Sequence, residues 1–255
     1  MHIPKDRFNV QAEEYAKFRP LYPDSLYDVI FQFVKHFDDA WDCGTGNGQV
    51  ARILSDRFRS VYATDISVKQ IGQAPLRDNI SYRIERAEFC SSPNGIFDLI
   101  TVAQAIHWFD FDAFYQQVQR VLKPQGLLAI WAYGNIQVNE EIDQKINYLY
   151  HDILSKFWDA ERVYIDEKMQ SIPFPFCNQR TYELNMEVSW SPVQLFGYIK
   201  TWSAWQHYYK EYPEEETNER SVISGFCHEV TSMWPLNEKR TLRFPVYLRL
   251  GNLCD

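Results

Sequence analysis

A short glycine-rich segment, residues 41–49, has the residue types and spacing of a loop that binds a nucleotide-like cofactor. Three glycines at alternate positions, Gly44, Gly46 and Gly48, follow the acidic Asp42. The residues before the loop suit a strand, and those after it have the apolar 3.6-residue rhythm of a helix. A glycine turn between a strand and a helix is a place where the backbone comes close to a ligand. A dinucleotide loop would read Gly-x-Gly-x-x-Gly, so the one-residue difference in spacing favours another cofactor.

A second acidic residue lies where a ribose would be. Asp65 ends a predicted strand, 21 positions after Gly44. A carboxylate at that strand end can accept hydrogen bonds from both hydroxyls of a ribose. Several cofactors present a ribose there, so Asp65 supports a nucleoside cofactor without identifying it; an exposed turn aspartate is the alternative.

A third group of polar residues follows the buried strand predicted over 97–103. Gln104, His107 and Trp108 come at its carboxyl end. Open α/β sheets bind ligands at that end, so we expect these side chains to project toward the reactive side of the cofactor. Histidine changes its charge near neutral pH, which makes His107 the candidate catalytic residue; a core or helix-capping histidine is the alternative.

The Asp-x-Gly-x-Gly-x-Gly segment resembles motif I of the class I S-adenosylmethionine-dependent methyltransferases. In that family the loop passes under the methionine part of the cofactor, and the acidic residue, here Asp42, serves its ammonium end. Residues 86–89 resemble the segment whose acidic side chain and backbone meet the adenine, which makes Glu88 a candidate. Residues 97–110 resemble motif IV of the small-molecule enzymes. Gln125 stands where the family usually has glycine before its fifth strand.

Two further segments, residues 8–23 and 197–204, resemble the trans-aconitate methyltransferase-like branch of this family. In such enzymes the N-terminal segment folds over the cofactor, which implies that Tyr15 and Arg19 close on it. The planar guanidinium of Arg19 suits the methionine carboxylate; a structural Arg-Pro turn is the alternative. Residues 137–177 match least and correspond to the variable cap.

The spacing and the resemblance together give the expected site. His107 is the predicted catalytic residue, Trp108 and Trp202 are expected to wall the acceptor pocket, and no metal site is expected. The predicted cofactor is S-adenosyl-L-methionine. Its expected binding residues are Tyr15, Arg19, Asp42, Gly44, Thr45, Gly46, Asn47, Gly48, Asp65, Ile66, Ala87, Glu88, Gln104 and Ala105.

The expected reaction is methyl transfer to a small molecule, by O-methylation of a carboxylate or a hydroxyl. A carboxylate acceptor would need no base, whereas a hydroxyl would need deprotonation, and His107 is then the first candidate. Aromatic residues make up 16% of the chain and favour a ring-bearing or apolar acceptor. The family resemblance favours a small carboxylic acid. Two alternatives stay open: an NAD(P)-dependent oxidoreductase, which the glycine spacing disfavours, and a cofactor-binding homologue without activity.

The bulk composition narrows the class of partner. The chain has 255 residues and a formal charge of −8, with 34 acidic and 26 basic residues, so a nucleic acid or an acidic membrane is not an expected partner. The five cysteines form no CxxC pair, which predicts neither a zinc site nor a disulfide framework. No apolar leader or membrane-length run is visible. We expect a cytoplasmic monomer or homodimer with reduced thiols.

Short β-rich runs alternate with helical segments and predict an α/β fold. The expected architecture is a Rossmann-like, doubly wound, mostly parallel seven-stranded sheet with an antiparallel C-terminal strand and a helical cap. We expect strands over 39–43, 60–64, 80–85, 97–103 and 127–132, with two more over 182–190 and 242–250. The predicted regions are an N-terminal helical cap segment (1–36), a cofactor-binding core (37–135), a helical insertion or lid (136–180), and C-terminal strands and helices that complete the sheet (181–255).

Overall fold

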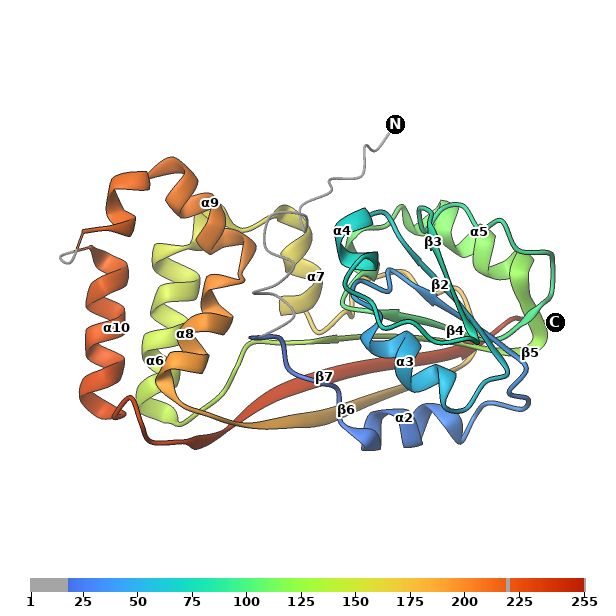
Figure 1. The fold of residues 1–255 in the computed structure, drawn as a ribbon, viewed down its shortest axis with the longest axis horizontal. Helices are drawn as coiled ribbons and strands as arrows, with labels where there is room; N and C mark the ends of the chain where they lie inside the picture. The colour runs from blue at the N-terminus through green and yellow to red at the C-terminus, as the bar shows by residue number, and fades with distance from the viewer. Residues whose placement is uncertain (1–17, 219–220, 255) are drawn as a thin grey trace.

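The computed structural model describes residues 18–218 and 221–254. Its centre is a seven-stranded sheet in the order β3-β2-β1-β4-β5-β7-β6 (Figure 1). Neighbours among β1 to β5 pair in parallel, and β7 is antiparallel to both β5 and β6. The prediction of a mostly parallel sheet with an antiparallel C-terminal strand is confirmed. The strands are β1 (Asp39–Cys43), β2 (Ser60–Asp65), β3 (Ile80–Ile84), β4 (Phe97–Ala103), β5 (Leu122–Tyr133), β6 (Cys177–Trp190) and β7 (Arg240–Asn252).

The bounds of β1 and β4 agree with the sequence pattern, whereas β5 begins five residues earlier than expected. The early part of β5 includes Gln125. The next residue, Gly126, packs so closely that a side chain would not fit there. A Cβ on Gly126 would lie 2.6 Å from Cδ1 of Leu122 and 2.9 Å from the carbonyl oxygen of Phe97. The glycine that follows Gln125 therefore lets β5 continue through this stretch, where its register with β4 shifts.

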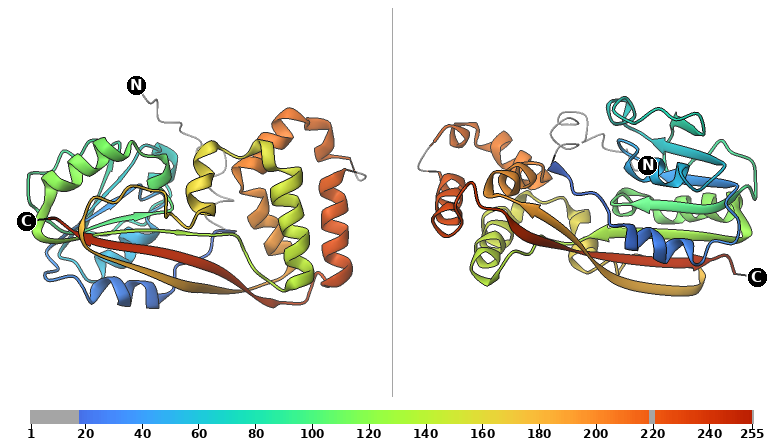
Figure 2. Two further views of the ribbon diagram at one scale, coloured as in Figure 1. Left: turned by 180° about the vertical axis from the view of Figure 1, so that it is seen from behind. Right: turned by 60° about the horizontal axis from the view of Figure 1, so that its bottom comes forward.

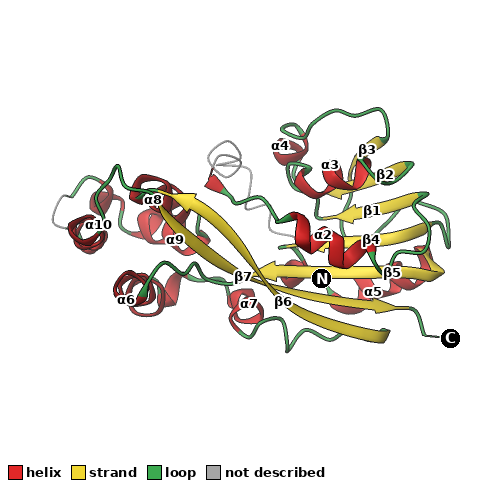
Figure 3. Ribbon diagram, turned by 90° about the horizontal axis from the view of Figure 1, so that it is seen from below, coloured by secondary structure: helices red, strands yellow, loops and turns green. Residues whose placement is uncertain are grey.

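Helices cover both faces of the sheet (Figure 3). On one face α2 (Asp24–Phe31) and α3 (Gln49–Ser55) bury Leu26, Ile30 and Leu54 against β5 and its neighbours. On the other face α5 (Phe111–Val121) packs on β4 and β1. The short helices α4 (Val68–Ile71) and η1 (Ile106–Trp108) follow β2 and β4 at their carboxyl ends. Among the described residues, no helix is long and apolar enough to cross a membrane.

A helical cap stands beside the sheet (Figures 1 and 2). Strands β6 and β7 extend past the end of β5 and lead into this cap. Residues 246–252 of β7 pair with β5, and residues 240–245 continue the pairing with β6. Helices from both the third and the fourth predicted regions pack together in this cap. They are α6 (Glu140–Tyr148), η2 (Leu149–Ile153), η3 (Ser155–Phe157), η4 (Ala160–Arg162), α7 (Val163–Asp166), α8 (Pro192–Lys200), α9 (Ser203–Glu211), η5 (Pro213–Glu216) and α10 (Val222–Met233).

One expectation about the cysteines is corrected. Cys177 and Cys254 form a disulfide although 77 residues separate them. The antiparallel ladder pairs Cys177 with Asn252, so the two cysteines meet at the edge of the sheet away from the glycine loop. Spacing along the chain gives no sign of this pair, because the contact depends on the register of β6 and β7. Cys43, Cys90 and Cys227 are free thiols.

Candidate functional site

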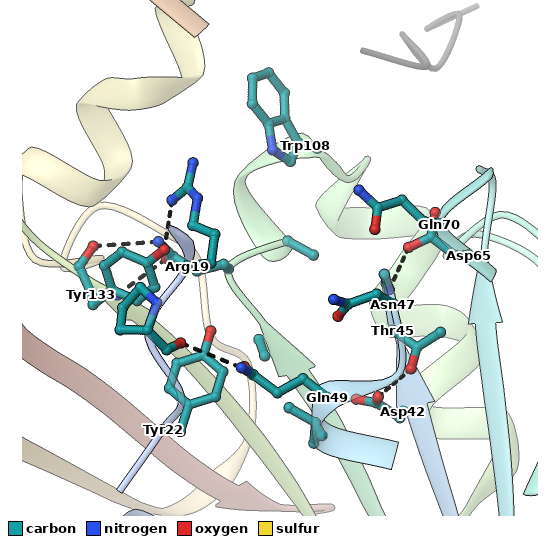
Figure 4. Close-up of a pocket in the computed structure, with 17 residues that line it drawn as sticks. Arg19, Tyr22, Asp42, Thr45, Asn47, Gln49, Asp65, Gln70, Trp108 and Tyr133 are labelled. Atoms are coloured by element: carbon teal, nitrogen blue, oxygen red, sulfur yellow. Dashed lines mark hydrogen bonds between the residues drawn. The ribbon is translucent and has the colours of Figure 1, made fainter. Parts of the chain in front are cut away.

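A cleft opens above the glycine loop, at the carboxyl ends of the parallel strands (Figure 4). Its empty volume is about 820 Å³, counting the open solvent at its mouth. The loop, the end of β2, the segment after β4 and the chain before α2 all contribute to it. The lining residues are Arg19, Pro20, Tyr22, Asp42, Gly44, Thr45, Gly46, Asn47, Gln49, Val50, Asp65, Gln70, Ala103, Gln104, Ala105, Trp108 and Tyr133.

The glycine loop is held against the sheet by its backbone. The N–H groups of Gly44 and the next residue both donate to one carbonyl at the end of β2, each at 2.9 Å. Gly44 and Gly46 have φ angles of +71° and +56°, in the region that favours glycine. A Cβ on Gly44 would lie 2.6 Å from the Cβ of Ala105, whereas the atom nearest to a Cβ on Gly46 would be 3.9 Å away. Gly44 is thus required by close packing, and Gly46 leaves room above the loop.

Asp42 lies at the base of the loop and is almost fully buried. Its carboxylate accepts hydrogen bonds from the hydroxyls of Thr45, at 2.5 Å, and Thr101, at 2.8 Å. Burial raises the pKa of Asp42 to about 6, although the two threonine hydroxyls oppose the shift. The site therefore has a buried carboxylate that titrates near neutral pH, and a cation bound in the cleft would favour its ionised form.

Asp65 forms part of the opposite wall. One of its oxygens accepts the N–H of Gly46 and the other accepts the N–H of Ser67, both at 2.8 Å. These bonds fix the carboxylate beside the loop and use part of its accepting capacity. Gln70 follows on α4, with its side chain near Asp65 in the same wall (Figure 4).

Arg19 forms the other end of the cleft. Its Nη1 donates to the hydroxyl of Tyr133 at 2.5 Å, and its Nη2 donates to the carbonyl of Thr201 at 3.5 Å. The guanidinium also lies 5.3 Å from the ring centroid of Tyr198. Arg19 thereby connects the chain before α2 to β5 and to the cap, and places a positive charge across the cleft from Asp65 (Figure 4).

Gln104 stands at the turn after β4 with a φ of +53°. Its N–H donates to the carbonyl of Trp131, and its side-chain oxygen accepts the N–H of Tyr133 at 3.1 Å. We expected this amide to project toward the cofactor. Instead, the hydrogen bond to the backbone of Tyr133 extends the contact between β4 and β5, and Gln104 lines the cleft while shaping the turn.

His107 lies in η1, with 8% of its surface exposed. Its Nδ1 is buried and has no hydrogen-bond partner in the described part of the chain. Burial, with a smaller effect of the Arg162 charge, lowers the pKa of His107 to about 3. The imidazole is therefore neutral at physiological pH and is a weak base.

Arg162 comes from the cap and faces this region. Its Nε donates to the hydroxyl of Tyr150 at 2.5 Å, and its guanidinium lies 5.3 Å from that ring and 5.1 Å from the ring of Trp158. The two aromatic rings hold the guanidinium, its Nε also pairs with the carboxylate of Asp166 at 3.4 Å, and its charge contributes to the lowered pKa of His107. An arginine with a partner carboxylate, that of Asp166, therefore lies where the cap meets the end of β4.

The structure brings most of the predicted site residues into the cleft, and places others elsewhere. Glu88 accepts the N–H of Asp110, which precedes α5, and also contacts Arg86. Trp202 is buried in the cap against Tyr150 and Trp158. Tyr15 lies outside the described residues. The remaining predicted residues that are not among those lining the cleft are Gly48, Ile66, Ala87 and His107.

Four polar or aromatic side chains of the cleft were missed from the sequence: Tyr22, Gln49, Gln70 and Tyr133. Tyr133 ends β5, and the rule that ligands bind at the carboxyl ends of strands could have found it. Gln49 donates to the carbonyl of Pro20 at 3.3 Å and so joins the loop to the chain before α2. That contact and the position of Gln70 depend on folding and have no local signal.

The residues present fit S-adenosylmethionine. This cofactor has an amino acid at one end and a ribose with its base at the other. The cleft has a guanidinium, that of Arg19, at one end, and a carboxylate, that of Asp65, at the other. The buried side-chain oxygen of Gln70 has no partner in the described residues and can take a hydrogen-bond donor. Open space above Gly46 leaves room for a ligand over the loop.

Comparison with known proteins agrees with this geometry. A family model described as a methyltransferase domain matches residues 41–130. A Dictyostelium discoideum protein whose name describes it as a methyltransferase is 35% identical over 209 residues, which cover 80% of each chain. A methyltransferase of Aspergillus candidus is 28% identical over 204 residues; the match covers 68% of this chain and 63% of that relative, less than two thirds of its length. A solved structure from Anaeromyxobacter dehalogenans, described as a type II methyltransferase, has a TM-score of 0.83 and 30% identity and covers 93% of this chain and all of that one.

Proposed function

We propose that this chain, which belongs to the class I S-adenosylmethionine-dependent methyltransferases, methylates a carboxylate oxygen of a small organic acid. The methyltransferase activity and its cofactor follow from the family. The acceptor is our inference, and the observation that carries it is the buried, neutral state of His107.

A hydroxyl or amine acceptor needs a group that removes its proton. General bases work best when their pKa lies near the working pH, and a histidine with a pKa of about 3 is far below that range. A carboxylate is already ionised at neutral pH and needs no base. His107 is also buried and is not among the residues that line the cleft, so it is not assigned as a base, and this favours a carboxylate acceptor.

The charged groups on the acceptor side also favour a carboxylate acceptor. Arg162, held by Tyr150 and Trp158 and paired through its Nε with Asp166, lies at the junction of cap and core. A guanidinium binds carboxylates in a planar, two-point geometry. The resemblance to the trans-aconitate methyltransferase-like branch favours the same acceptor class. Aromatic residues of the cap hold this arginine and fill the cap core.

When bound, S-adenosylmethionine supplies a methyl group that a carboxylate oxygen takes up as the carbon–sulfur bond breaks, which leaves S-adenosylhomocysteine. The chain contributes mainly alignment, which accounts for about 7–11 kcal/mol in well-oriented reactions. We assign Arg19 to the methionine carboxylate, Asp42 to the ammonium end and Asp65 to the ribose. Residues 44–47 form the floor of the site, and Trp108 and Ala105 border the side where the acceptor enters.

The nature of the product tests this proposal. The purified protein is incubated with labelled cofactor and matched pairs of small acids and their alcohol analogues. We expect label in methyl esters, which mild alkali cleaves to release labelled methanol. Label in alkali-stable methyl ethers, or in alcohols at rates equal to those of the acids, would show that the acceptor class is wrong.

A further inference from the structure

Gln70 has an unusual combination of burial and unused hydrogen-bonding capacity. Its side chain is 3% exposed, and its Oε1 has no hydrogen-bond partner in the described part of the chain. The backbone N–H of Gln70 is held by the hydroxyl of Ser67 at 3.2 Å. The main chain is thus fixed at this point, while the side-chain oxygen is left without a donor.

The surroundings of this oxygen are those of the cleft. Gln70 lines the cleft, and its Oε1 lies 3.9 Å from the point where a Cβ on Gly46 would stand. Asp65 is next to it, with one backbone N–H already bound to each of its oxygens (Figure 4). Two acceptors from different segments therefore converge on the space above Gly46.

A buried carbonyl without a donor is unfavourable, and nearly all such groups in proteins have a partner. A donor from the ligand is the natural partner for a group in this place. The cofactor has donors on its ammonium, its ribose and its adenine. Gln70 lies beside Asp65, across the cleft from Arg19, so the ribose hydroxyls are the donors that match its position.

We propose that Gln70 is a cofactor-recognition residue whose Oε1 accepts a hydrogen bond from one ribose hydroxyl, while Asp65 accepts from the other. This inference concerns the cofactor and is independent of the identity of the methyl acceptor. Asp65 at the end of β2 and Gln70 on α4 together recognise the ribose.

The proposal predicts two effects of opposite sign for Gln70→Met. Methionine has a similar length and no polar oxygen, so the protein without ligand should be more stable, with a Tm about 2 °C higher. Binding of S-adenosylhomocysteine should be weaker by about tenfold, since one hydrogen bond to the ribose is lost. A residue with a merely structural role would not give this combination.

Calorimetric titration with three ligands tests the assignment. S-adenosylhomocysteine is compared with its analogues that lack the 2′-hydroxyl or the 3′-hydroxyl. One of the two analogues lacks the hydroxyl that Gln70 is proposed to bind. For that analogue, the dissociation constants of the wild-type protein and of the Gln70→Met variant should agree within about twofold. Melting of the ligand-free proteins is measured in parallel.

Two further variants serve as controls. Gln73→Met makes the same change at an exposed position just after α4 and should alter neither affinity nor Tm. Gln70→Asn keeps a buried amide but withdraws it from the ligand, so we expect weaker binding without the gain in Tm. The proposal is overturned if Gln70→Met binds S-adenosylhomocysteine as the wild type does, which would indicate a water-bound amide. It is also overturned if the variant weakens all three ligands equally.

Discussion

The two sides of the cleft are built in different ways. The cofactor side consists of residues 42–48 and 65–70, in which backbone groups and short side chains bond to neighbours on β1 and β2. The acceptor side combines His107 and Arg162, which come from two distant parts of the chain. A short motif therefore specifies one side, whereas the packing of cap on core specifies the other. Changes on the first side should affect folding and cofactor binding together, and changes on the second should affect acceptor use alone.

The largest effect is expected for Gly44→Ala. The new Cβ would stand 2.6 Å from the Cβ of Ala105, in a backbone conformation with positive φ. Strain and overpacking together should lower the free energy of unfolding by about 3–5 kcal/mol and abolish measurable cofactor binding. Urea denaturation and calorimetric titration with S-adenosylhomocysteine measure the two effects.

Two matched variants separate these causes. Gly95 also has a positive φ, but a Cβ there would meet no atom within 4 Å, so Gly95→Ala should show the cost of the backbone alone, about 1–2 kcal/mol. Adding Ala105→Gly to Gly44→Ala removes the close contact and should restore stability to about the level of Gly95→Ala. If the double variant is no more stable than Gly44→Ala, contact with Ala105 is not the cause.

A smaller effect on the same side concerns the pH dependence of stability. Burial raises the pKa of Asp42 from 3.8 to about 6. Since the raised pKa belongs to the folded state, the contribution of this carboxyl to stability is fully present below pH 3.8 and is lost as the pH rises through 6. The difference between the two pKa values corresponds to a loss of about 3 kcal/mol in the free energy of unfolding.

The variant Asp42→Asn removes this ionisation. Relative to the wild type, its free energy of unfolding should therefore rise by about 2.4 kcal/mol between pH 4 and pH 7.5. Denaturation curves at several pH values measure the difference. A difference that stays constant with pH would show that Asp42 does not titrate in this range in the folded protein.

The smallest expected effect lies on the acceptor side. Arg162→Gln should lower kcat/KM for a carboxylic acid by about 30-fold, because one charge-assisted contact is lost. The affinity for S-adenosylhomocysteine should stay within about twofold of the wild type, which would separate the two sides of the cleft. Arg180 also stacks on an aromatic ring, that of Phe33, and Arg180→Gln is the matched control. Equal effects of both substitutions on kcat/KM would remove Arg162 from the acceptor site.

Much of the fold could be predicted because its signals are local. The bounds of β4 follow from a run of mostly apolar residues, and the glycine loop follows from its spacing. The extension of β5 back to Leu122 was missed, since residues 123–126 include a proline and a glycine, which suggest a turn. The roles proposed from the loop and from Asp65 rest on residues that the structure does bring into the cleft.

The sequence by itself determined the α/β sheet, the cofactor loop and the family, because strand patterns and glycine spacing are properties of neighbouring residues. Only the tertiary structure decided that Cys177 meets Cys254, that Arg19 donates to Tyr133, and that Gln70 is buried without a partner. Each of these contacts joins segments whose separation depends on strand register, on cap packing or on the path of a loop. No local pattern encodes those distances, so these features are seen only in the folded chain.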